Sequence, residues 1–402
     1  MTNWYVKQDN GTDSTLTGAV SPPTGSGVPA TTVTGPDAYG ASAVVGTSTL
    51  YAREDHDHGL PAAPTGTAIP VGFAVPAVSG TLTQTDINNA VSGGFSGIYL
   101  NPTVTWNVAS KLVIGGGTNQ PFILRSSMYG GSGYGDKNTP PAHYVNLTMT
   151  TGDGIQIPDN AAKVRFEGIG IIGTVTGACV HINGARQSGL DNCYVENLST
   201  TVGSYAVIID SSTGGADAED NDSHFCYFTG GYGGLGIGIN DVTFHSNDCV
   251  WIGITTHGGV YGVNHVAGGN HTFINWYDRS NPSGACFQSA GEVTIFGGED
   301  RNTTVGGYAI SVIAGECWLV RRAVTQAGAT TDISVTGGTL YMEGVRSNSL
   351  KLLQTAGVVY LGRDCYLENG AYVCNGGTIY YPSVGPTITA LPPTGTGTKT
   401  AY

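Results

Sequence analysis

The chain has 402 residues, a net charge of −13 and only 11% charged residues, against about 25% in an ordinary soluble domain. Its 16 Lys and Arg residues are scattered, and because phosphate backbones are bound through clustered basic residues, we expect no nucleic-acid partner. No stretch approaches 18 apolar residues, so we also expect no membrane insertion.

The glycine content indicates the fold class, and the cysteine pattern indicates the cellular compartment in which the protein is made. The 63 glycines, together with the low charge, indicate dense β-structure with many tight turns. The start, MTNWYVKQDNGTD, lacks the apolar region of a secretory signal. None of the eight cysteines forms a C-x-x-C pair, and several occupy apolar positions of the repeat described below. We therefore expect buried free thiols in a protein made in a reducing cytoplasm, with a disulfide framework or a zinc site as the alternative.

Residues 1–80 form the first predicted segment. It is rich in Gly, Pro, Ser and Thr, as in SPPTGSGVP and LPAAPTGTAIP, and cannot bury a core of its own. It is predicted to be extended. One island interrupts this composition, GTSTLYAREDHDHGLP at residues 46–61.

Residues 81–160 are predicted to hold a capping helix and entry strands. Thr85 is the expected N-cap of a short helix from Asp86 to Val91, ended by Gly93 and Gly94. Two strand-like runs follow, GIYL at 97–100 and VTWNV at 104–108. A short amphipathic helix of this kind can close the open end of a solenoid core.

An internal repeat predicts a right-handed parallel β-helix over residues 161–381. Five segments align without gaps: AGEVTIFGG, AGECWLVRR, TGGTLYMEG, AGVVYLGRD and NGGTIYYPS. Their shared glycines, 291, 315, 337, 357 and 376, are separated by 24, 22, 20 and 19 residues. A second short strand precedes each segment, and short strands recurring every 20 residues or so are typical of solenoid turns. Residues 382–402 remain as a C-terminal tail.

The alignment also predicts which side chains face the interior. The position two after the shared glycine and the position four after it lie on one face of a strand, because successive side chains alternate. We assign both columns to the interior, where like residues stack between turns. The columns are Val293, Cys317, Thr339, Val359 and Thr378, and Ile295, Leu319, Tyr341, Leu361 and Tyr380. The flanking positions are also apolar, so the opposite facing stays possible and would favour packing between chains.

The extended low-complexity N-terminus, the capping segment and the β-helix together resemble a tail spike or tail fibre (minor tail protein) of a tailed bacteriophage. The segment VVGTSTLYAREDHDHGLP at residues 44–61, with its aromatic-Ala-Arg-x-x-His-x-His core, is similar to stretches of such proteins. The resemblance implies a homotrimer in the virion, docked on other phage tail proteins through its N-terminal segment and contacting a host-surface glycan. This chain departs from larger spikes because only about 20 residues follow Pro382.

His56 and His58 are the candidate metal ligands. At i, i+2 spacing both imidazoles project from one side of an extended chain. One chain supplies too few ligands, but the three chains that the resemblance implies would supply six nitrogens, which suit an octahedral transition metal. We expect one ion per trimer, iron first and zinc or nickel as substitutes. Two histidines in a solvated loop are the alternative.

Two groups of residues are candidates for chemistry on glycans. Paired carboxylates can hydrolyse them, and carboxylates cluster in the longest interruption of the repeat and again after a first strand: Asp217, Glu219, Asp220, Glu299 and Asp300. The first cluster also includes Asp222 and could hold calcium, although no complete EF-hand pattern is present. A solvated acidic loop is the favoured interpretation of this cluster. Aromatic residues beside carboxylates and near Arg321 and Arg322 suit sugar binding, and the candidate glycan-binding residues are Trp251, Trp276, Tyr277 and Asp278. Structural stacking or a groove between subunits is the alternative. Because no carboxylates are evidently opposed across adjacent turns, we expect host recognition rather than catalysis, with a polysaccharide depolymerase on the same scaffold as the alternative.

Overall fold

The computed structural model of the chain describes residues 5–7, 13–15, 72–115, 121–126, 145–159, 161–210, 218–230, 232–238, 246–266, 269–279, 287–302, 308–326, 331–347, 351–367, 371–383 and 393–402. The chain divides into two compact units, Met1–Ala68 and Ile69–Tyr402. In the first unit, β1 (Tyr5–Lys7) pairs antiparallel with β2 (Asp13–Thr15).

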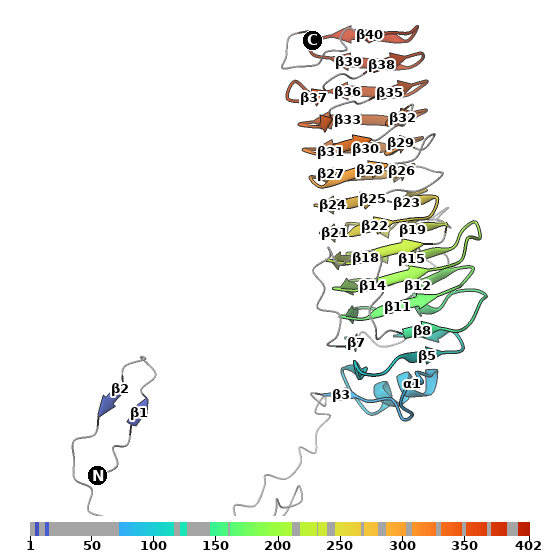
Figure 1. Cartoon of the computed structure of the whole chain (residues 1–402), viewed down its shortest axis with the longest axis vertical. Helices are drawn as coiled ribbons and strands as arrows, with labels where there is room; N and C mark the ends of the chain where they lie inside the picture. Colours follow the sequence, from blue (N-terminus) through green and yellow to red (C-terminus); the bar gives the residue numbers. More distant parts are fainter. Residues whose placement is uncertain are drawn as a thin grey trace, which may run out of the picture. The chain divides into compact units, whose positions relative to one another are not determined.

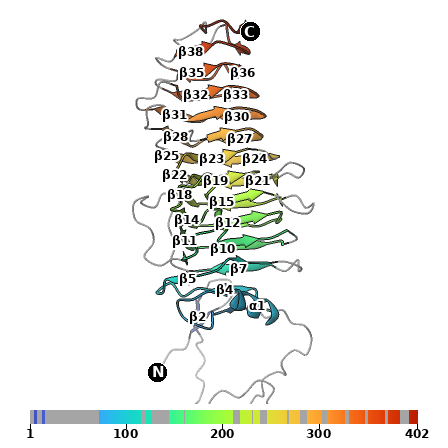
Figure 2. The same ribbon diagram turned by 90° about the vertical axis from the view of Figure 1, so that its right-hand side faces the viewer.

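The second unit is a parallel β-helix, which confirms the predicted fold class (Figures 1 and 2). We name its three sheets sheet 1, sheet 2 and sheet 3. Sheet 1 has 14 strands: β3 (Phe73–Ala74), β4 (Gly97–Tyr99), β7 (Phe122–Arg125), β10 (Val164–Glu167), β13 (Gly189–Asp191), β17 (Asp222–His224), β21 (Cys249–Ile252), β24 (Asn270–Ile274), β27 (Glu292–Phe296), β30 (Glu316–Val320), β33 (Thr339–Glu343), β36 (Val358–Leu361), β39 (Thr378–Tyr381) and β40 (Thr398–Ala401).

The other two sheets have 11 strands each. Sheet 2 contains β5 (Trp106–Val108), β8 (Val145–Leu147), β11 (Gly170–Gly173), β14 (Tyr194–Asn197), β18 (Tyr227–Gly230), β22 (Thr255–His257), β25 (Tyr277–Arg279), β28 (Glu299–Asn302), β31 (Ala323–Gln326), β34 (Arg346–Ser347) and β37 (Tyr366–Leu367). Sheet 3 contains β6 (Leu112–Val113), β9 (Ile155–Ile157), β12 (Ala178–Asn183), β15 (Tyr205–Asp210), β19 (Gly233–Ile237), β23 (Tyr261–His265), β26 (Phe287–Ser289), β29 (Ile310–Val312), β32 (Ile333–Val335), β35 (Lys351–Gln354) and β38 (Ala371–Cys374).

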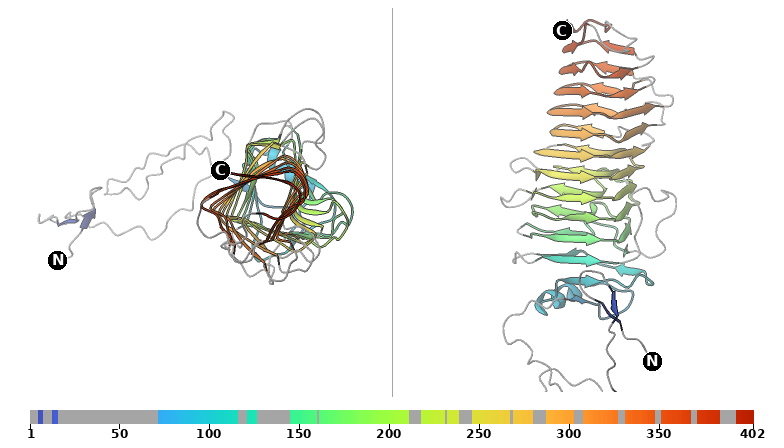
Figure 3. Two further views of the ribbon diagram at one scale, coloured as in Figure 1. Left: turned by 90° about the horizontal axis from the view of Figure 1, so that it is seen from above. Right: turned by 90° about the vertical axis from the view of Figure 1, so that its left-hand side faces the viewer.

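The chain visits the three sheets in turn, and each strand pairs in parallel with the strand one turn away. Seen along the axis, the turns superimpose around a common interior (Figure 3). Stacked strands extend beyond the predicted range of 161–381, from Phe73 in β3 to Ala401 in β40. A separate short pair, β16 (Ala218–Glu219) with β20 (Ser246–Asn247), lies outside the three sheets.

The capping helix is present but begins earlier than predicted. Helix α1 spans Gln84–Ser92, and its N-cap is Thr83 rather than Thr85. The Thr83 hydroxyl accepts a hydrogen bond from the amide of Asp86, and the Asp86 carboxylate accepts one from the amide of Thr83 at 2.9 Å. This reciprocal pair is a capping box. It uses Asp86 as the third helical residue, so the helix starts two residues before the predicted position.

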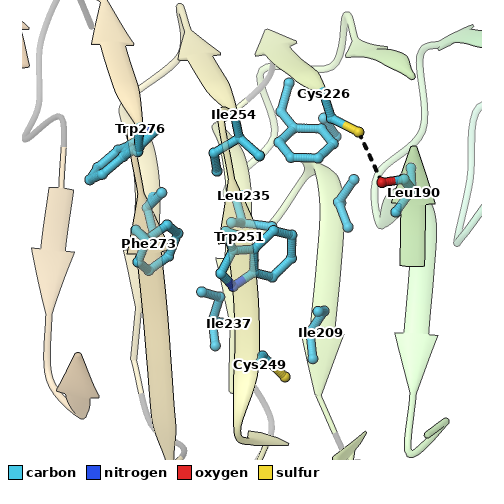
Figure 4. Packing of buried hydrophobic residues seen from close by; sticks show 14 of the residues in the cluster. Leu190, Ile209, Cys226, Leu235, Ile237, Cys249, Trp251, Ile254, Phe273 and Trp276 are labelled. Carbon is cyan, nitrogen blue, oxygen red and sulfur yellow. Dashed lines mark hydrogen bonds between the residues drawn. The ribbon is translucent and has the colours of Figure 1, made fainter. Parts of the chain in front are cut away.

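The interior is one continuous apolar column of stacked side chains. In its middle part, Trp251 lies parallel to Phe273 with ring centroids 6.0 Å apart (Figure 4). Cysteines fill small positions of the same column, and the Cys226 thiol donates to the carbonyl of Leu190 at 3.2 Å (Figure 4). All seven cysteines in the described part of the chain are buried free thiols, as predicted. Burial raises the pKa of Cys249 to about 12, so this thiol stays protonated and unreactive.

The predicted facing is right in three turns and wrong in two. In register, Cys317 pairs with Leu340 rather than Thr339, and Val359 pairs with Ile379 rather than Thr378. The interior columns are Val293, Cys317, Leu340, Val359 and Ile379, and Ile295, Leu319, Met342, Leu361 and Tyr381. Thr339, Tyr341, Thr378 and Tyr380 therefore face outward, which corrects the alignment by one residue.

The cause of this slip is a pair of adjacent glycines in the two affected turns. The structurally equivalent corner glycine is the second of each pair, Gly338 and Gly377, rather than Gly337 and Gly376. Both have positive φ, 64° and 74°, and an added Cβ would lie 2.5 Å from the carbonyl oxygen of Gly315 in one case and 2.2 Å from that of Gly357 in the other. Only glycine permits this backbone approach between turns.

Candidate functional site

Four aromatic side chains form a ladder on the outer face of sheet 1. Trp318, Tyr341, Tyr360 and Tyr380 are register partners in β30, β33, β36 and β39, which lie in consecutive turns (Figure 1). Their ring centroids are 3.7, 4.9 and 4.8 Å apart, with interplanar angles of 9°, 4° and 6°. Trp318 and Tyr360 are each 38% exposed. We call this set the aromatic ladder.

The stacking decides which parts of the rings a ligand can reach. Between Trp318 and Tyr380 the ring faces cover one another, so ring edges form the exposed surface there. At the β27 end the neighbour in the same column is the small side chain of Thr294. The indole face of Trp318 at that end therefore borders open space.

A groove of about 360 Å³ runs beside the ladder. Its polar wall consists of Glu343, Arg363 and Asp364, and Tyr402 lies at its end. The Arg363 guanidinium lies 5.5 Å from the centre of the Tyr402 ring, and the Tyr402 hydroxyl donates to the carbonyl of Leu361 at 2.6 Å. The groove thus combines aromatic edges with two exposed carboxylates and a guanidinium, which is a suitable surface for a polyhydroxylated ligand.

Further down the same face, an arginine and a histidine together contact two carboxylates in a closed ring. Arg165 contacts both Asp191 and Asp222, and His224 contacts the same two carboxylates from the other side at 2.7 and 3.2 Å. Gly189 is the register partner of Arg165 in one neighbouring strand and of Asp222 in the other. A Cβ added at Gly189 would lie 3.0 Å from the Arg165 guanidinium. Because each carboxylate oxygen already has a partner, the ring is built to hold adjacent turns together.

Another polar cluster lies on the outer side of sheet 3. His181 bridges Asp153 at 2.8 Å and Asp210 at 2.6 Å. Burial lowers the pKa of His181, but the hydrogen bonds to the two carboxylates outweigh this effect and raise it to about 9. Burial alone would raise the pKa of Asp153. The hydrogen bond to His181 and the charge of His181 outweigh burial and lower this pKa to about 2. His181 is therefore a buried cation that links three turns.

The structure brings several predicted glycan-binding residues together, but inside the core. Trp276 and Asp278 are fully buried. The Trp276 indole donates to Thr256, whose hydroxyl donates to Asp278 at 2.7 Å. In the next turn Asp300 pairs with Arg322, and both side chains have zero exposure. The guanidinium also lies 4.6 Å from the centre of the Trp276 ring.

Three of the four predicted glycan-binding residues are thus buried in the structure. Trp251 is also fully buried, so a glycan on the surface reaches neither indole, and the role that fits them is packing. Tyr277 is half-buried on sheet 2, away from the aromatic ladder. Trp276 and Tyr277 differ in burial because adjacent side chains point to opposite sides. Trp276 comes just before β25 and points into the interior, whereas Tyr277 is the first residue of β25 and points outward.

The predicted catalytic carboxylates do not converge. Asp300 is buried against Arg322, whereas its neighbour Glu299 is half-buried and alternates to the outer side of β28. Asp220 is exposed at a positive φ of 54°, and Glu219 lies in β16. Asp217 lies outside the described residues. Glu219 and Asp220 lie beside β17, whereas Glu299 and Asp300 lie in β28, so the two groups belong to different turns of the β-helix.

His56 and His58 also lie outside the described residues, so the metal-site prediction stands untested. Within the part of the chain that the structure describes, no three His, Cys, Asp or Glu side chains are grouped so that they could hold a metal ion. The same part contains no helix that is both long and apolar enough to cross a membrane.

Sequence reasoning missed the aromatic ladder, although a signal was present. Trp318, Tyr341, Tyr360 and Tyr380 each come three residues after a corner glycine: 315, 338, 357 and 377. Aligning the turns on the second glycine of each pair places all four aromatics in one column. The alignment on the first glycine split them between two columns and sent two of them into the core.

No protein-family model matches the sequence, and no curated protein matches it. Two solved structures are similar in fold. The first, the crystal structure of the Agl-KA catalytic domain, has 12% sequence identity and a TM-score of 0.43, with 83% of this chain and 70% of that chain covered. The second, the Streptococcus pneumoniae surface protein and adhesin PfbA, has 12% identity and a TM-score of 0.37, with 74% and 94% covered.

Proposed function

We propose that the chain is a glycan-recognition protein, a homotrimeric tail spike or tail fibre of a tailed bacteriophage that uses the aromatic ladder to bind host-surface polysaccharide. The observation that carries the recognition part is the outward-facing row of Trp318, Tyr341, Tyr360 and Tyr380 beside a groove with charged walls. Rigid aromatic rings on a stacked sheet are already ordered before binding, so little conformational entropy is lost when a ligand binds.

The virion part of the proposal rests on the sequence. Its support is the low-complexity segment at 1–80 and the similarity of residues 44–61 to tail proteins. An apolar stretch on the outer face of sheet 1 supports packing between chains. There Val250, Ile252 and Ile274 are partly exposed and Phe296 is 44% exposed, and contiguous outward apolar residues are typical of protein contacts.

Replacing Tyr341 with alanine is expected to weaken polysaccharide binding by about tenfold or more, because central aromatic side chains dominate recognition surfaces. Tyr341 faces outward, so the fold should persist. The measurement is co-sedimentation of purified protein with capsule and cell-wall polysaccharides from a panel of bacteria. Tyr277→Ala on sheet 2 is the matched control and should bind as the unaltered protein does.

Equal binding by the two variants would rule the ladder out as the recognition site. The same incubations test the alternative function. If the polysaccharide chains become shorter, the protein is a depolymerase, and if they are bound without shortening, it is a recognition protein.

The N-terminal metal is a separate part of the proposal. Six imidazoles from three chains would hold one transition metal ion, and binding free energy would become assembly free energy, since each chain contributes only two of the six ligands. Elemental analysis of the purified oligomer should give about one metal ion per three chains, as six-nitrogen coordination requires. The double variant His56→Ala, His58→Ala should lose it. A metal-free trimer of unaltered sequence would contradict this part.

A further inference from the structure

A second, smaller groove borders the free indole face of Trp318. It has a volume of about 160 Å³ and crosses β24, β27 and β30, which are consecutive turns in Figure 2. Thr272, Thr294 and Trp318 form its aromatic and hydroxyl side, and Glu292 and Glu316 form its charged side. Both carboxylates are exposed. His271 also lines the groove, but burial lowers its pKa, so it adds no positive charge there.

The two carboxylates of this groove are direct neighbours. Glu292 and Glu316 are register partners in adjacent parallel strands, and like charges placed opposite one another destabilise a sheet. Within the described residues, no Lys or Arg forms an ion pair with either of them. Three carboxylates nearer the other end of this face are compensated, in contrast: Glu167 pairs with Arg125 at 3.1 Å, and Asp191 and Asp222 pair with Arg165.

The uncompensated carboxylates of Glu292 and Glu316 line the same groove as the indole of Trp318, so a bound cation would contact all three. A cation near an indole face is attracted by the ring quadrupole, and the two carboxylates supply charge-assisted hydrogen-bond acceptors beside it. A hard metal ion fits less well, since calcium requires six to eight oxygen ligands and an indole supplies none. A neutral sugar would leave the repulsion between Glu292 and Glu316 in place.

We infer that this groove binds an amino sugar in its protonated form, with the ammonium group between Glu292 and Glu316 and the pyranose ring against the indole of Trp318. The inference rests on the proposed glycan-recognition function and specifies its ligand. Recognition at this groove favours glycans that carry free amines over glycans whose amines are acetylated. The aromatic ladder then continues the contact along the same face of sheet 1.

The test uses the full-length protein and two probes of equal length, a glucosamine hexamer and its fully N-acetylated counterpart, under conditions in which the free amine is protonated. Calorimetric titration should show at least about tenfold tighter binding of the free-amine hexamer, a difference of about 1.4 kcal/mol, and the difference should shrink with added salt. In the double variant Glu292→Gln, Glu316→Gln the two hexamers should bind equally.

Two controls keep the result interpretable. Glu167→Gln removes a carboxylate from the same face of sheet 1 but outside both grooves, and it should leave the preference unchanged. Because the double variant relieves a like-charge contact, its thermal midpoint should equal or exceed that of the unaltered protein, so a loss of preference cannot come from unfolding. A double variant that keeps the preference would overturn the inference.

The remaining outcomes would overturn the amino-sugar assignment but leave the proposed glycan-recognition function to its own test. If the N-acetylated hexamer binds as tightly as the free-amine hexamer, or if a trilysine peptide does, the amino-sugar assignment is wrong. If neither hexamer binds, the assignment is likewise wrong. In each of these cases the proposed function is judged separately, by whether Tyr341→Ala abolishes binding to cell-surface polysaccharide.

Discussion

Replacing Arg322 with methionine is expected to lower the free energy of unfolding by about 3–5 kcal/mol, the usual cost of removing one partner of a buried ion pair. The Arg322 guanidinium donates to both carboxylate oxygens of Asp300, at 3.0 Å for its Nε, and to the carbonyl of Gly297 at 2.8 Å. Burial raises the pKa of Asp300, and the guanidinium opposes this shift. Without it, an uncompensated carboxylate remains in the core.

Chemical denaturation followed by circular dichroism measures the effect, and Arg321→Met is the matched control. Arg321 is exposed and adjacent in sequence, so its loss should change stability by no more than about 0.5 kcal/mol. The double variant Asp300→Leu, Arg322→Met should recover part of the loss, because a buried pair is often replaceable by apolar side chains of similar volume. Equal effects of the two arginine variants would contradict the assigned burial.

Leu319→Asp is the second substitution with a large expected effect. Leu319 is fully buried in β30 between its register partners Ile295 and Met342. An aspartate there would bury an unpaired charge, and we expect a loss of more than about 4 kcal/mol or the absence of soluble protein.

Thr294→Asp is the comparison for Leu319→Asp, because Thr294 is next to Ile295 in sequence but lies on the outer side of sheet 1. It should remain soluble, with a thermal midpoint close to that of the unaltered protein. Soluble yield and thermal melting of both variants provide the measurement. If the two substitutions were equally harmful, both faces of the sheet would have to be covered.

The turns of the β-helix could be predicted because stacking imposes the same requirement on each of them. Corner glycines and short strands recur in the sequence, and each of the five aligned segments contains a strand: β27, β30, β33, β36 and β39. The facing was harder to predict, since strands alternate with a period of two and a slip of one residue inverts it. Adjacent glycines at 337–338 and 376–377 left two equivalent alignments, and only the backbone approach between turns distinguishes them.

The candidate sites depended on this facing. Tyr341 and Tyr380 were assigned to the core, so the aromatic ladder could not be seen as a surface feature. Arg321 and Arg322 illustrate the opposite problem, because they look alike in sequence but only the second is buried. They lie at the corner between β30 and β31, where the regular alternation of side chains is interrupted by a residue with φ of 52°. A pattern read from either strand does not extend across such a corner.

The parallel stacking also determines how the β-helix responds to mechanical force. Hydrogen bonds between turns run along the axis, so tension along the axis acts on all the turns in series and on the three sheets of each turn in parallel. Within one junction, the sheet with the fewest register pairs is the weakest side. In sheet 2, β31 and β34 share a single register pair, Ala323 with Arg346, whereas β30 and β33 share five in sheet 1. At this junction, the sheet 2 side is therefore expected to separate before the sheet 1 side under a pull from both ends.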